Sequence, residues 1–349
     1  MTIATEGFCV IAVSSPTNDS IPENERGRPA DLHRRGGVGN AASPLPPPQL
    51  AVRVGATEGD MYGRYEEIGR SARAEILDVL PLDWSFKGKR MLDFGCGAGR
   101  VLRQFADEAR SADMRGCDID GPSVDWLNAH LSPPFSAVRN GEQPPPPWPD
   151  GTFDLIIAIS VFTHITTYWS DWLCELHRLL DSDGVLIATF LGAGMSELID
   201  REPWDEDRIG MNVLRRGQNW DRGGPCVLHS PWWIRKHWGR AFDVEFLRPA
   251  GFGEPEDREA GHGLVLLRKK DVDITPRELA QVATDEPREL QALLHNIEQL
   301  HRESADLERL HDNARANVAI RRPRDGLHVS ERNTRNDGPL RASCCGPRR

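Results

Sequence analysis

The sequence lacks three features: an excess of positive charge, paired cysteines and a long apolar run. Its 349 residues carry a formal net charge of −10, which disfavours a general binding surface for nucleic acid or anionic membrane. Its seven cysteines include no C-x-x-C pair and are odd in number, so free thiols in a reducing compartment are expected rather than a disulfide framework. The apolar stretch Phe8–Val13 is too short to span a bilayer, and it follows Glu6 with no basic residue before it, unlike a signal peptide.

The composition that remains is typical of a soluble globular protein. Hydrophobic residues make up 39% of the chain and charged residues 28%, which are ordinary values. The length allows one large domain with appendages, or two domains. We therefore expect a cytoplasmic protein with no nucleic-acid partner and no membrane insertion.

The stretch that organises the rest is Lys87–Phe105, which reads KGKRMLDFGCGAGRVLRQF. Its apolar run at Met91–Phe94 predicts a short strand that is buried on both faces, as in a parallel sheet. Three glycines follow within Gly95–Gly99, and apolar residues then recur at helical spacing from Arg100 to Ala109. The pattern predicts a strand, a glycine loop and a helix. Glycines in such a loop let the backbone approach a ligand where side chains would collide.

The spacing of the glycines separates two classes of cofactor. A dinucleotide-binding loop needs G-x-G-x-x-G, whereas this loop is G-x-G-x-G and has an acid two positions before it. An acid there repels a phosphate and suits a ligand with an ammonium group. The residues D-x-G-x-G-x-G resemble the first motif of class I S-adenosylmethionine-dependent methyltransferases. The resemblance implies that S-adenosylmethionine is the cofactor and that these residues contact it: Asp93, Gly95, Cys96, Gly97 and Gly99.

A second acid stands where sheets of this type bind a ribose. Ala112–Ile119 predicts a second strand, and Asp118 near its end follows Gly99 by 19 residues (118 − 99). An acid near this distance accepts hydrogen bonds from the ribose hydroxyls, and Ile119 would then lie against adenine. The alternative role for Asp118 is a helix N-cap, which Ser123 serves as well.

Two further strands end in polar residues. The third, Ala137–Val138, ends near Asn140 and Gly141. In the family an aspartate often binds the adenine amino group here, and Asn140 is the nearest equivalent, although an ordinary Asn-Gly turn explains the pair equally well. The sequence PDGTFDLIIAISVFTHI, Pro149–Ile165, resembles the family's fourth-strand motif. Ser160 lies at the end of that strand, where open α/β sheets bind ligands, so we assign it to the cofactor site.

The resemblance covers roughly residues 62–269 and implies an α/β fold. It is the Rossmann-like three-layer sandwich of class I methyltransferases, with a seven-stranded, mostly parallel sheet whose last strand is antiparallel. Residues 194–230 exceed this minimal fold and are rich in Gly, Trp and charge. We interpret them as an insert that shapes the acceptor pocket, with a surface elaboration holding its own hydrophobic patch as the alternative. Apolar spacing predicts helices at Tyr62–Leu80, Ser123–Leu131, Trp169–Leu180 and Pro231–Ala241, and later strands at Val185–Leu191, Asp243–Leu247 and Gly263–Leu267.

The methyltransferase domain is expected to span residues 61–271. Residues 1–60 show little periodicity and contain the proline cluster Pro44–Pro48, which predicts a disordered leader. A translation start near Met61 would place that leader outside the protein.

The chain after the domain changes character. Residues 272–320 predict a helical extension, because apolar residues keep near-heptad spacing over 290–318. This extension either pairs with a second copy as a coiled-coil homodimer or packs back on its own domain. Residues 321–349 predict a disordered basic tail.

The chemistry of methyl transfer sets what else is needed. Displacement at a sulfonium methyl is mainly a matter of positioning and requires no metal. A hydroxyl acceptor must also lose a proton, and His164, just past the fourth strand, is the candidate base because the pKa of histidine lies near neutrality. His229 is a second candidate, and a structural role is the alternative for both.

These observations predict an S-adenosylmethionine-dependent methyltransferase that acts on a small-molecule or glycan acceptor at oxygen. The rival is a binding protein that kept the cofactor pocket, lost catalysis and acts through its coiled coil. A nicotinamide-dependent oxidoreductase is disfavoured by the glycine spacing.

Overall fold

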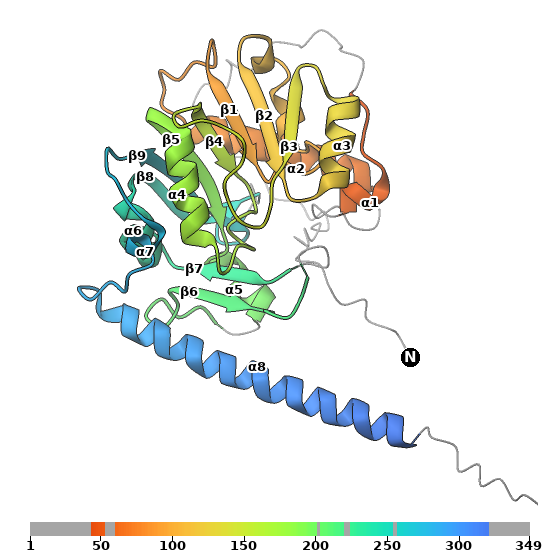
Figure 1. The fold of residues 1–349 in the computed structure, drawn as a ribbon, viewed down its shortest axis with the longest axis vertical. Helices are drawn as coiled ribbons and strands as arrows, with labels where there is room; N and C mark the ends of the chain where they lie inside the picture. The colour runs from red at the N-terminus through yellow and green to blue at the C-terminus, as the bar shows by residue number, and fades with distance from the viewer. Residues whose placement is uncertain (1–42, 53–59, 201–202, 220–223, 254–256, 321–349) are drawn as a thin grey trace, which may run out of the picture. The chain divides into compact units, whose positions relative to one another are not determined.

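The computed structural model describes residues 43–52, 60–200, 203–219, 224–253 and 257–320. Its main element is a seven-stranded sheet with the strand order β3-β2-β1-β4-β5-β9-β8 (Figure 1). Strands β1 to β5 pair in parallel, and β9 is antiparallel to both of its neighbours. The predicted mostly parallel sheet with an antiparallel last strand is confirmed. The strands are β1 Arg90–Phe94, β2 Asp113–Asp118, β3 Phe135–Arg139, β4 Phe153–Ala158, β5 Leu180–Phe190, β8 Phe242–Phe252 and β9 His262–Lys269.

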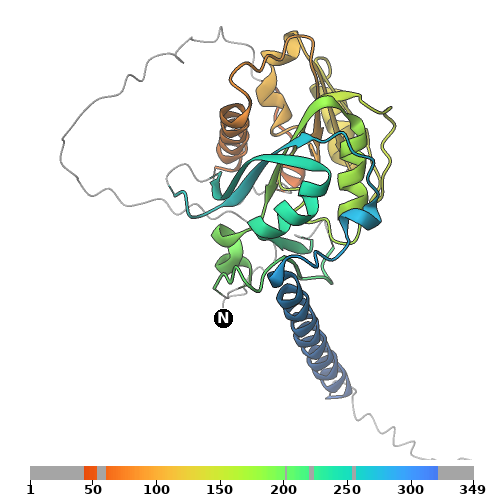
Figure 2. The ribbon, with the colours of Figure 1, turned by 90° about the vertical axis from the view of Figure 1, so that its left-hand side faces the viewer.

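Alternate side chains of the sheet enter two separate hydrophobic cores. In β4, Ile156 and Ala158 belong to one core, and Leu155 and Ile157 belong to the other, as the two-residue period of a strand requires. Helices cover both cores, and Figures 1 and 2 show α2 and α4 on opposite sides of the sheet. The covering helices are α4 Trp169–Leu179 and α6 Pro231–His237 on the first core, and α2 Met61–Val79 and α3 Gly121–His130 on the second.

The segment after the glycine loop differs from the predicted continuous helix. It forms two short 3₁₀-helices, η2 Leu102–Phe105 and η3 Glu108–Arg110. The N–H of Gln104 donates to the carbonyl of Val101, three residues back, as in a 3₁₀ turn. The apolar spacing therefore predicted burial correctly and the type of helix wrongly. The buried side chains are Val101, Leu102 and Phe105.

The insert after β5 forms a small unit with its own sheet. Helix α5, Ala193–Asp200, leads to β6, Met211–Leu214, which pairs antiparallel with β7, Cys226–His229. A separate hydrophobic cluster holds these elements together, which favours the alternative of a surface elaboration. The insert also contacts the loop after β4, because the N–H of Val227 donates to the carbonyl of Thr163 at 2.8 Å.

Part of the predicted leader is packed against the domain. Residues 43–52 contain the short helix α1, Pro48–Ala51, and the side chain of Leu50 is buried. The guanidinium of Arg103 donates to the carbonyl of Pro44 at 2.9 Å. The prediction of a disordered leader through residue 60 is therefore wrong for this segment, because one short turn buries too few apolar side chains to create a visible period. Residues 1–42 lie outside the described part of the chain.

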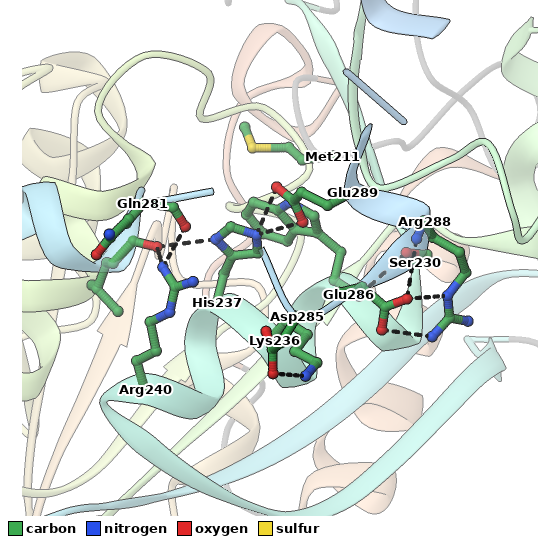
Figure 3. Close-up of polar contacts among 12 residues, drawn as sticks. Met211, Ser230, Lys236, His237, Arg240, Gln281, Asp285, Glu286, Arg288 and Glu289 are labelled. Carbon is green, nitrogen blue, oxygen red and sulfur yellow. Dashed lines mark hydrogen bonds and ion pairs between the residues drawn. The ribbon is translucent and has the colours of Figure 1, made fainter. Parts of the chain in front are cut away.

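The C-terminal extension begins as part of the domain. Helix α7, Pro276–Leu279, and the start of α8, Pro287–Ile320, contact the end of α6. The ring of His237 joins all three, with Nδ1 3.0 Å from the carbonyl oxygen of Leu279 and Nε2 3.1 Å from a carboxylate oxygen of Glu289 (Figure 3). The compact unit runs through Glu298, so the domain extends past the predicted boundary at residue 271.

The apolar residues at near-heptad spacing over 290–318, here called the seam, lie on helix α8, and those of its first turns are exposed. At its start Ala292 is 4% exposed and belongs to the first core, so one face of the first turns packs on the domain. The seam positions lie on another face, and their exposed fractions are 62% for Leu290, 39% for Leu293, 49% for Ile297, 40% for Leu300 and 63% for Leu307. Among the helices in the described ranges, none is both long and apolar enough to cross a membrane.

Removal of residues 1–52 should destabilise the domain relative to removal of residues 1–42. Burial of the Leu50 side chain contributes about 1.5–3 kcal/mol, and only the longer deletion removes it. Thermal unfolding of the two truncated chains measures the difference. Leu50→Ser should reproduce it, and Leu45→Ser is the matched control because Leu45 is 38% exposed. Equal stability of the two truncated chains would contradict the docking of this segment.

We propose that the seam over 290–318 forms a coiled-coil homodimer. Ile297→Lys places a charge at a seam position and should convert the dimer to a monomer. Leu310→Lys is the control, since Leu310 is 65% exposed and lies outside the heptad series. Light scattering over a concentration range is the measurement. If the unmodified protein is a monomer at every concentration, the coiled-coil homodimer is contradicted.

Candidate active site

The glycine loop lies at the carboxyl end of the central strand β1. Gly95, Gly97 and Gly99 have positive φ values of 83°, 52° and 81°, which glycine adopts without strain. Side chains would also collide here, because a Cβ on Gly95 would lie 2.3 Å from a methyl carbon of Val161. The conformation of the loop therefore requires glycine, as the sequence predicted.

Asp93, the last residue but one of β1, is a buried acid. Its side chain is 2% exposed, and its Oδ2 has no hydrogen-bond partner among the described residues. Burial, and then the nearby charge of Asp118, raise the pKa of Asp93 to about 7, while the nearby Arg100 opposes the rise. A buried carboxyl with an unused oxygen is costly unless a partner arrives, so this place suits a cationic ligand group.

Arg100 and Tyr65 close the site from the other side of the loop. Arg100 follows the loop directly and exchanges electrostatic interactions with Asp93 and Tyr65. Tyr65, on α2, is fully buried, and its hydroxyl donates to the carbonyl of Ala98 at 3.4 Å. Helix α2 therefore packs over the loop. The sequence argument did not assign Arg100 to the site, although its position next to the loop was a usable signal.

Asp118 braces the loop from the end of β2. Its Oδ2 accepts the N–H of Gly97 at 2.7 Å, and its Oδ1 accepts the N–H of Asp120 at 2.8 Å. Each carboxylate oxygen can accept more than one hydrogen bond, and the side chain is only half-buried. Asp118 is therefore able to fix the loop and to accept a ligand hydroxyl.

A pocket of about 560 Å³ lies beside Asp118, at the ends of β2 and β3. The amide Nδ2 of Asn140 donates to the carbonyl of Gly141 at 2.8 Å, whereas Oδ1 is buried without a partner. That oxygen is an acceptor suited to an amino group, and the side chain of Ile119 offers an apolar surface for a ring. The lining residues are Ile119, Arg139, Asn140, Gly141 and Glu142.

Cys96 is turned away from this pocket. Its side chain is 4% exposed, and a Cβ on Gly116 would lie 2.6 Å from its sulfur. The thiol therefore fills space beneath the loop, and burial raises its pKa. Cys96 is a predicted site residue, and only its backbone is available to a ligand.

Three polar side chains meet beyond the end of β4. Ser160 has a positive φ of 59°, and its Oγ lies 3.3 Å from Nδ1 of His262, the first residue of β9. His164 places Nδ1 2.8 Å from the carbonyl oxygen of Pro225 in the insert. Because a carbonyl only accepts, Nδ1 of His164 carries the proton and Nε2 is bare in the neutral ring.

Both histidines are neutral near pH 7. Burial lowers the pKa of His164, and the hydrogen bond to Pro225 opposes the fall. Burial lowers the pKa of His262 to about 4, and repulsion from Arg100 and from the protonated form of His164 adds to the effect. His262 was missed by sequence reasoning because no local motif marks it. Its signal was topological, since an antiparallel last strand begins at the edge where the parallel strands end.

His229, the second predicted base, is a core residue. It is fully buried among aromatic side chains, with its ring centroid 5.3 Å from that of Trp233 and 5.6 Å from that of Trp238. Neither ring nitrogen has a hydrogen-bond partner of good geometry among the described residues, and burial lowers the pKa of His229 to about 3. The structural alternative therefore describes His229 better than a catalytic role.

The sequence from Leu92 to Ala188 matches a known family. Residues 92–188 fit the family model described as "Methyltransferase domain". The chain contains a methyltransferase domain. The predicted resemblance to class I methyltransferases is confirmed for this region, which includes the glycine loop, Asp118 and β4.

Curated relatives of the methyltransferase domain match it over part of their length. The chain is 29% identical over 171 residues to sphingolipid C9-methyltransferase 2 of Gibberella zeae, covering 47% of this chain and 31% of that protein. It is 25% identical over 133 residues to fatty-acid O-methyltransferase of Mycolicibacterium smegmatis, covering 38% and 46%. The chain thus spans less than half the length of each of these relatives.

Solved structures also match. An S-adenosylmethionine-dependent methyltransferase from Mesorhizobium loti superposes with a TM-score of 0.45 and 15% identity, covering 57% of this chain and 98% of that one. Separately, within the part of the chain that the structure describes, no group of three or more His, Cys, Asp or Glu side chains is arranged to hold a metal ion.

The pKa of Asp93 makes the stability of the protein depend on pH. In the unfolded chain the carboxyl loses its proton near pH 3.9, whereas in the folded chain it keeps the proton up to about pH 7. The folded state binds more protons across this window, so the contribution of Asp93 to the unfolding free energy falls as pH rises from 4 to 7, by about 4 kcal/mol in total. Denaturant unfolding at several pH values measures this.

Asp93→Asn is the matched variant for that experiment. It cannot ionise, so its stability relative to the unmodified protein should be lowest at pH 4 and should rise toward pH 8. Parallel pH profiles for the two proteins would mean that Asp93 is ionised throughout. Asp154→Asn is the control acid, because hydrogen bonds from Lys89 and Arg90 lower the pKa of Asp154.

Proposed function

We propose that this protein transfers the methyl group of S-adenosylmethionine to a hydroxyl oxygen of a small-molecule or glycan acceptor. The observation that carries the proposal is the buried, unpartnered oxygen of Asp93 beside the glycine loop of a methyltransferase domain. The co-substrate carries an ammonium group, a ribose with two free hydroxyls and an adenine amino group. The site offers one acceptor for each.

The fit is made by residues at the ends of three neighbouring strands. Asp93, near the end of β1, faces the ammonium group of the co-substrate. Arg100 lies close to Asp93 and would meet the carboxylate of the co-substrate. Asp118 at the end of β2 accepts from the ribose hydroxyls. Ile119 lies against adenine, and Oδ1 of Asn140 accepts from its amino group. The glycines of the loop and Ser160 would contact the co-substrate through their backbone atoms.

His164 is the candidate base for the acceptor. In the reaction, Nε2 of His164 takes the acceptor proton, and the acceptor oxygen forms a bond to the methyl carbon. The electron pair of the breaking carbon–sulfur bond stays on sulfur, and the imidazolium returns its proton to solvent. The lowered pKa of His164 keeps Nε2 free to accept at neutral pH.

Oxygen as the methylated atom is favoured by the name of one relative, a fatty-acid O-methyltransferase. Another relative is named as a sphingolipid methyltransferase. The insert is a candidate for part of the acceptor pocket, since Pro225 holds His164 and Val227 holds Thr163. A cytoplasmic location and the absence of a nucleic-acid partner stay predictions from charge and cysteine usage.

The second candidate function is a methyltransferase-like binding protein without turnover. The exposed seam of α8 favours it, because that surface offers a way to act through a partner. The two functions share the cofactor site and differ only in chemistry. Incubation with methyl-labelled S-adenosylmethionine and a cell extract separates them, since only an enzyme labels a product.

Two substitutions should separate binding from chemistry. Asp118→Ala removes a charged acceptor worth about 1.5–3 kcal/mol per hydrogen bond and also releases Gly97, so affinity for S-adenosylhomocysteine should fall at least tenfold. His164→Ala should lower turnover by a factor on the order of 100 and leave that affinity nearly unchanged. Calorimetry and labelled-methyl transfer are the measurements. At high pH the His164→Ala rate should partly recover, because the acceptor then ionises without help.

Two outcomes would contradict the proposal. Tight NAD binding with no response to S-adenosylhomocysteine would overturn the cofactor assignment. Equal loss of cofactor affinity in His164→Ala and Asp118→Ala would make His164 structural. His177→Gln is the control for histidine replacement, since Nε2 of His177 meets the carbonyl of Lys270 at 2.9 Å, away from the glycine loop.

A further inference from the structure

Ser160 is held in a conformation that its surroundings must enforce. Its φ of 59° lies in the left-handed region, which is unfavourable for a residue other than glycine. Two contacts hold it there. The N–H of Ser160 donates to Oγ1 of Thr189 at 2.7 Å, and Oγ lies 3.3 Å from Nδ1 of His262. Thr189 is fully buried in β5 and His262 is 6% exposed at the start of β9, so two other strands fix this residue.

The fixed hydroxyl and the candidate base lie in the same loop. Ser160 follows β4, which ends at Ala158, and the N–H of His164 in the same loop donates to the carbonyl of Val161. Both side chains are half-buried and so remain open to a ligand. The two groups are also separately anchored, Ser160 by β9 and His164 by the insert through Pro225. The edge of the sheet therefore presents two independent hydrogen-bonding groups to an acceptor.

The groups that face this edge are neutral or already compensated. His164 and His262 are neutral near pH 7 because burial lowers the pKa of each. The cation that reaches His262 is Arg100, and Arg100 also faces the acid Asp93. A charged acceptor would lose hydration without gaining an opposite charge, whereas neutral oxygens would be satisfied.

We infer that Ser160, positioned by His262, is a second acceptor-binding group, and that the acceptor carries two neighbouring neutral oxygens, as in a vicinal diol of a catechol or a sugar. This inference rests on the proposed methyl transfer. One oxygen meets His164 and is methylated, and the other hydrogen-bonds to Oγ of Ser160. His262 acts through Ser160 and is a positioning residue.

Matched pairs of probes test the inference. Methyl-labelled S-adenosylmethionine is supplied with catechol or phenol, and with trans-1,2-cyclohexanediol or cyclohexanol. Each diol should be methylated with a kcat/KM at least tenfold above that of its single-hydroxyl partner. The product should be a base-stable ether. Palmitate and putrescine serve as charged probes, and neither should accept label.

Variants then connect the preference to the two residues. Ser160→Gly tolerates the left-handed backbone and removes the hydroxymethyl side chain, so it should abolish the diol preference by raising KM for the diol. His262→Phe should do the same, and His262→Gln, which can still hydrogen-bond to Ser160, should restore most of the preference. Affinity for S-adenosylhomocysteine should stay within twofold in all three. His177→Gln should behave as the unmodified protein.

Several results would overturn the inference. Equal use of diols and single alcohols, or equal losses for both in Ser160→Gly, would remove Ser160 from acceptor binding. Weaker binding of S-adenosylhomocysteine to Ser160→Gly would assign its hydroxyl to the cofactor. Label in palmitate as a base-labile ester, label in putrescine, or no label in any probe by a protein that binds S-adenosylhomocysteine would reject the diol class. Failure to bind S-adenosylhomocysteine would instead reject the proposed function itself.

Discussion

The site depends on one buried carboxyl group. Asp93 lies 2% exposed at the end of the central strand, close to a second acid, Asp118. A fold that places two acids together must leave one protonated or supply positive charge, and Arg100 supplies part of it. The remainder is left for a ligand. The domain therefore carries an unfavourable electrostatic term in its free state, and a cationic ligand removes that term on binding, which makes binding and folding stability parts of one equilibrium.

The glycine loop is shaped by the protein before any ligand arrives. The carboxylate of Asp118 accepts the N–H of Gly97, and the N–H groups of Gly95 and Cys96 donate to the carbonyl of Cys117. These bonds connect the ends of β1 and β2, so Asp118, the proposed acceptor for the ribose hydroxyls, also fixes the loop. Preorganisation of this kind lowers the entropy lost on binding. It also means that replacement of Asp118 changes the loop as well as the ribose contact.

The sequence made most of the fold predictable because its signals are local. Buried parallel strands are short apolar runs, and a glycine loop with an acid before it has a distinctive spacing. The segment after the loop was harder, since 3₁₀ and α-helical turns bury nearly the same positions and differ only in hydrogen bonding. Ser43–Val52 was missed because its contacts, such as that of Pro44 with Arg103, are with residues far along the chain. The same limit applies to His262, whose role depends on a strand order that no neighbouring residue encodes.

Strand order also explains how the site separates charge. The parallel strands β1, β2 and β3 carry Asp93, Asp118 and the Asn140 turn at or next to their carboxyl ends, and these are the groups proposed to bind the cofactor. On the other side of β1, Ser160 follows the end of β4, and the antiparallel β9 begins with His262 at the same edge. A parallel strand in that place would bring its last residue here and carry its first residue to the far edge. Reversal of one strand therefore supplies a buried, neutral histidine where the acceptor must approach, and it keeps that side free of the acids on which the cofactor side depends.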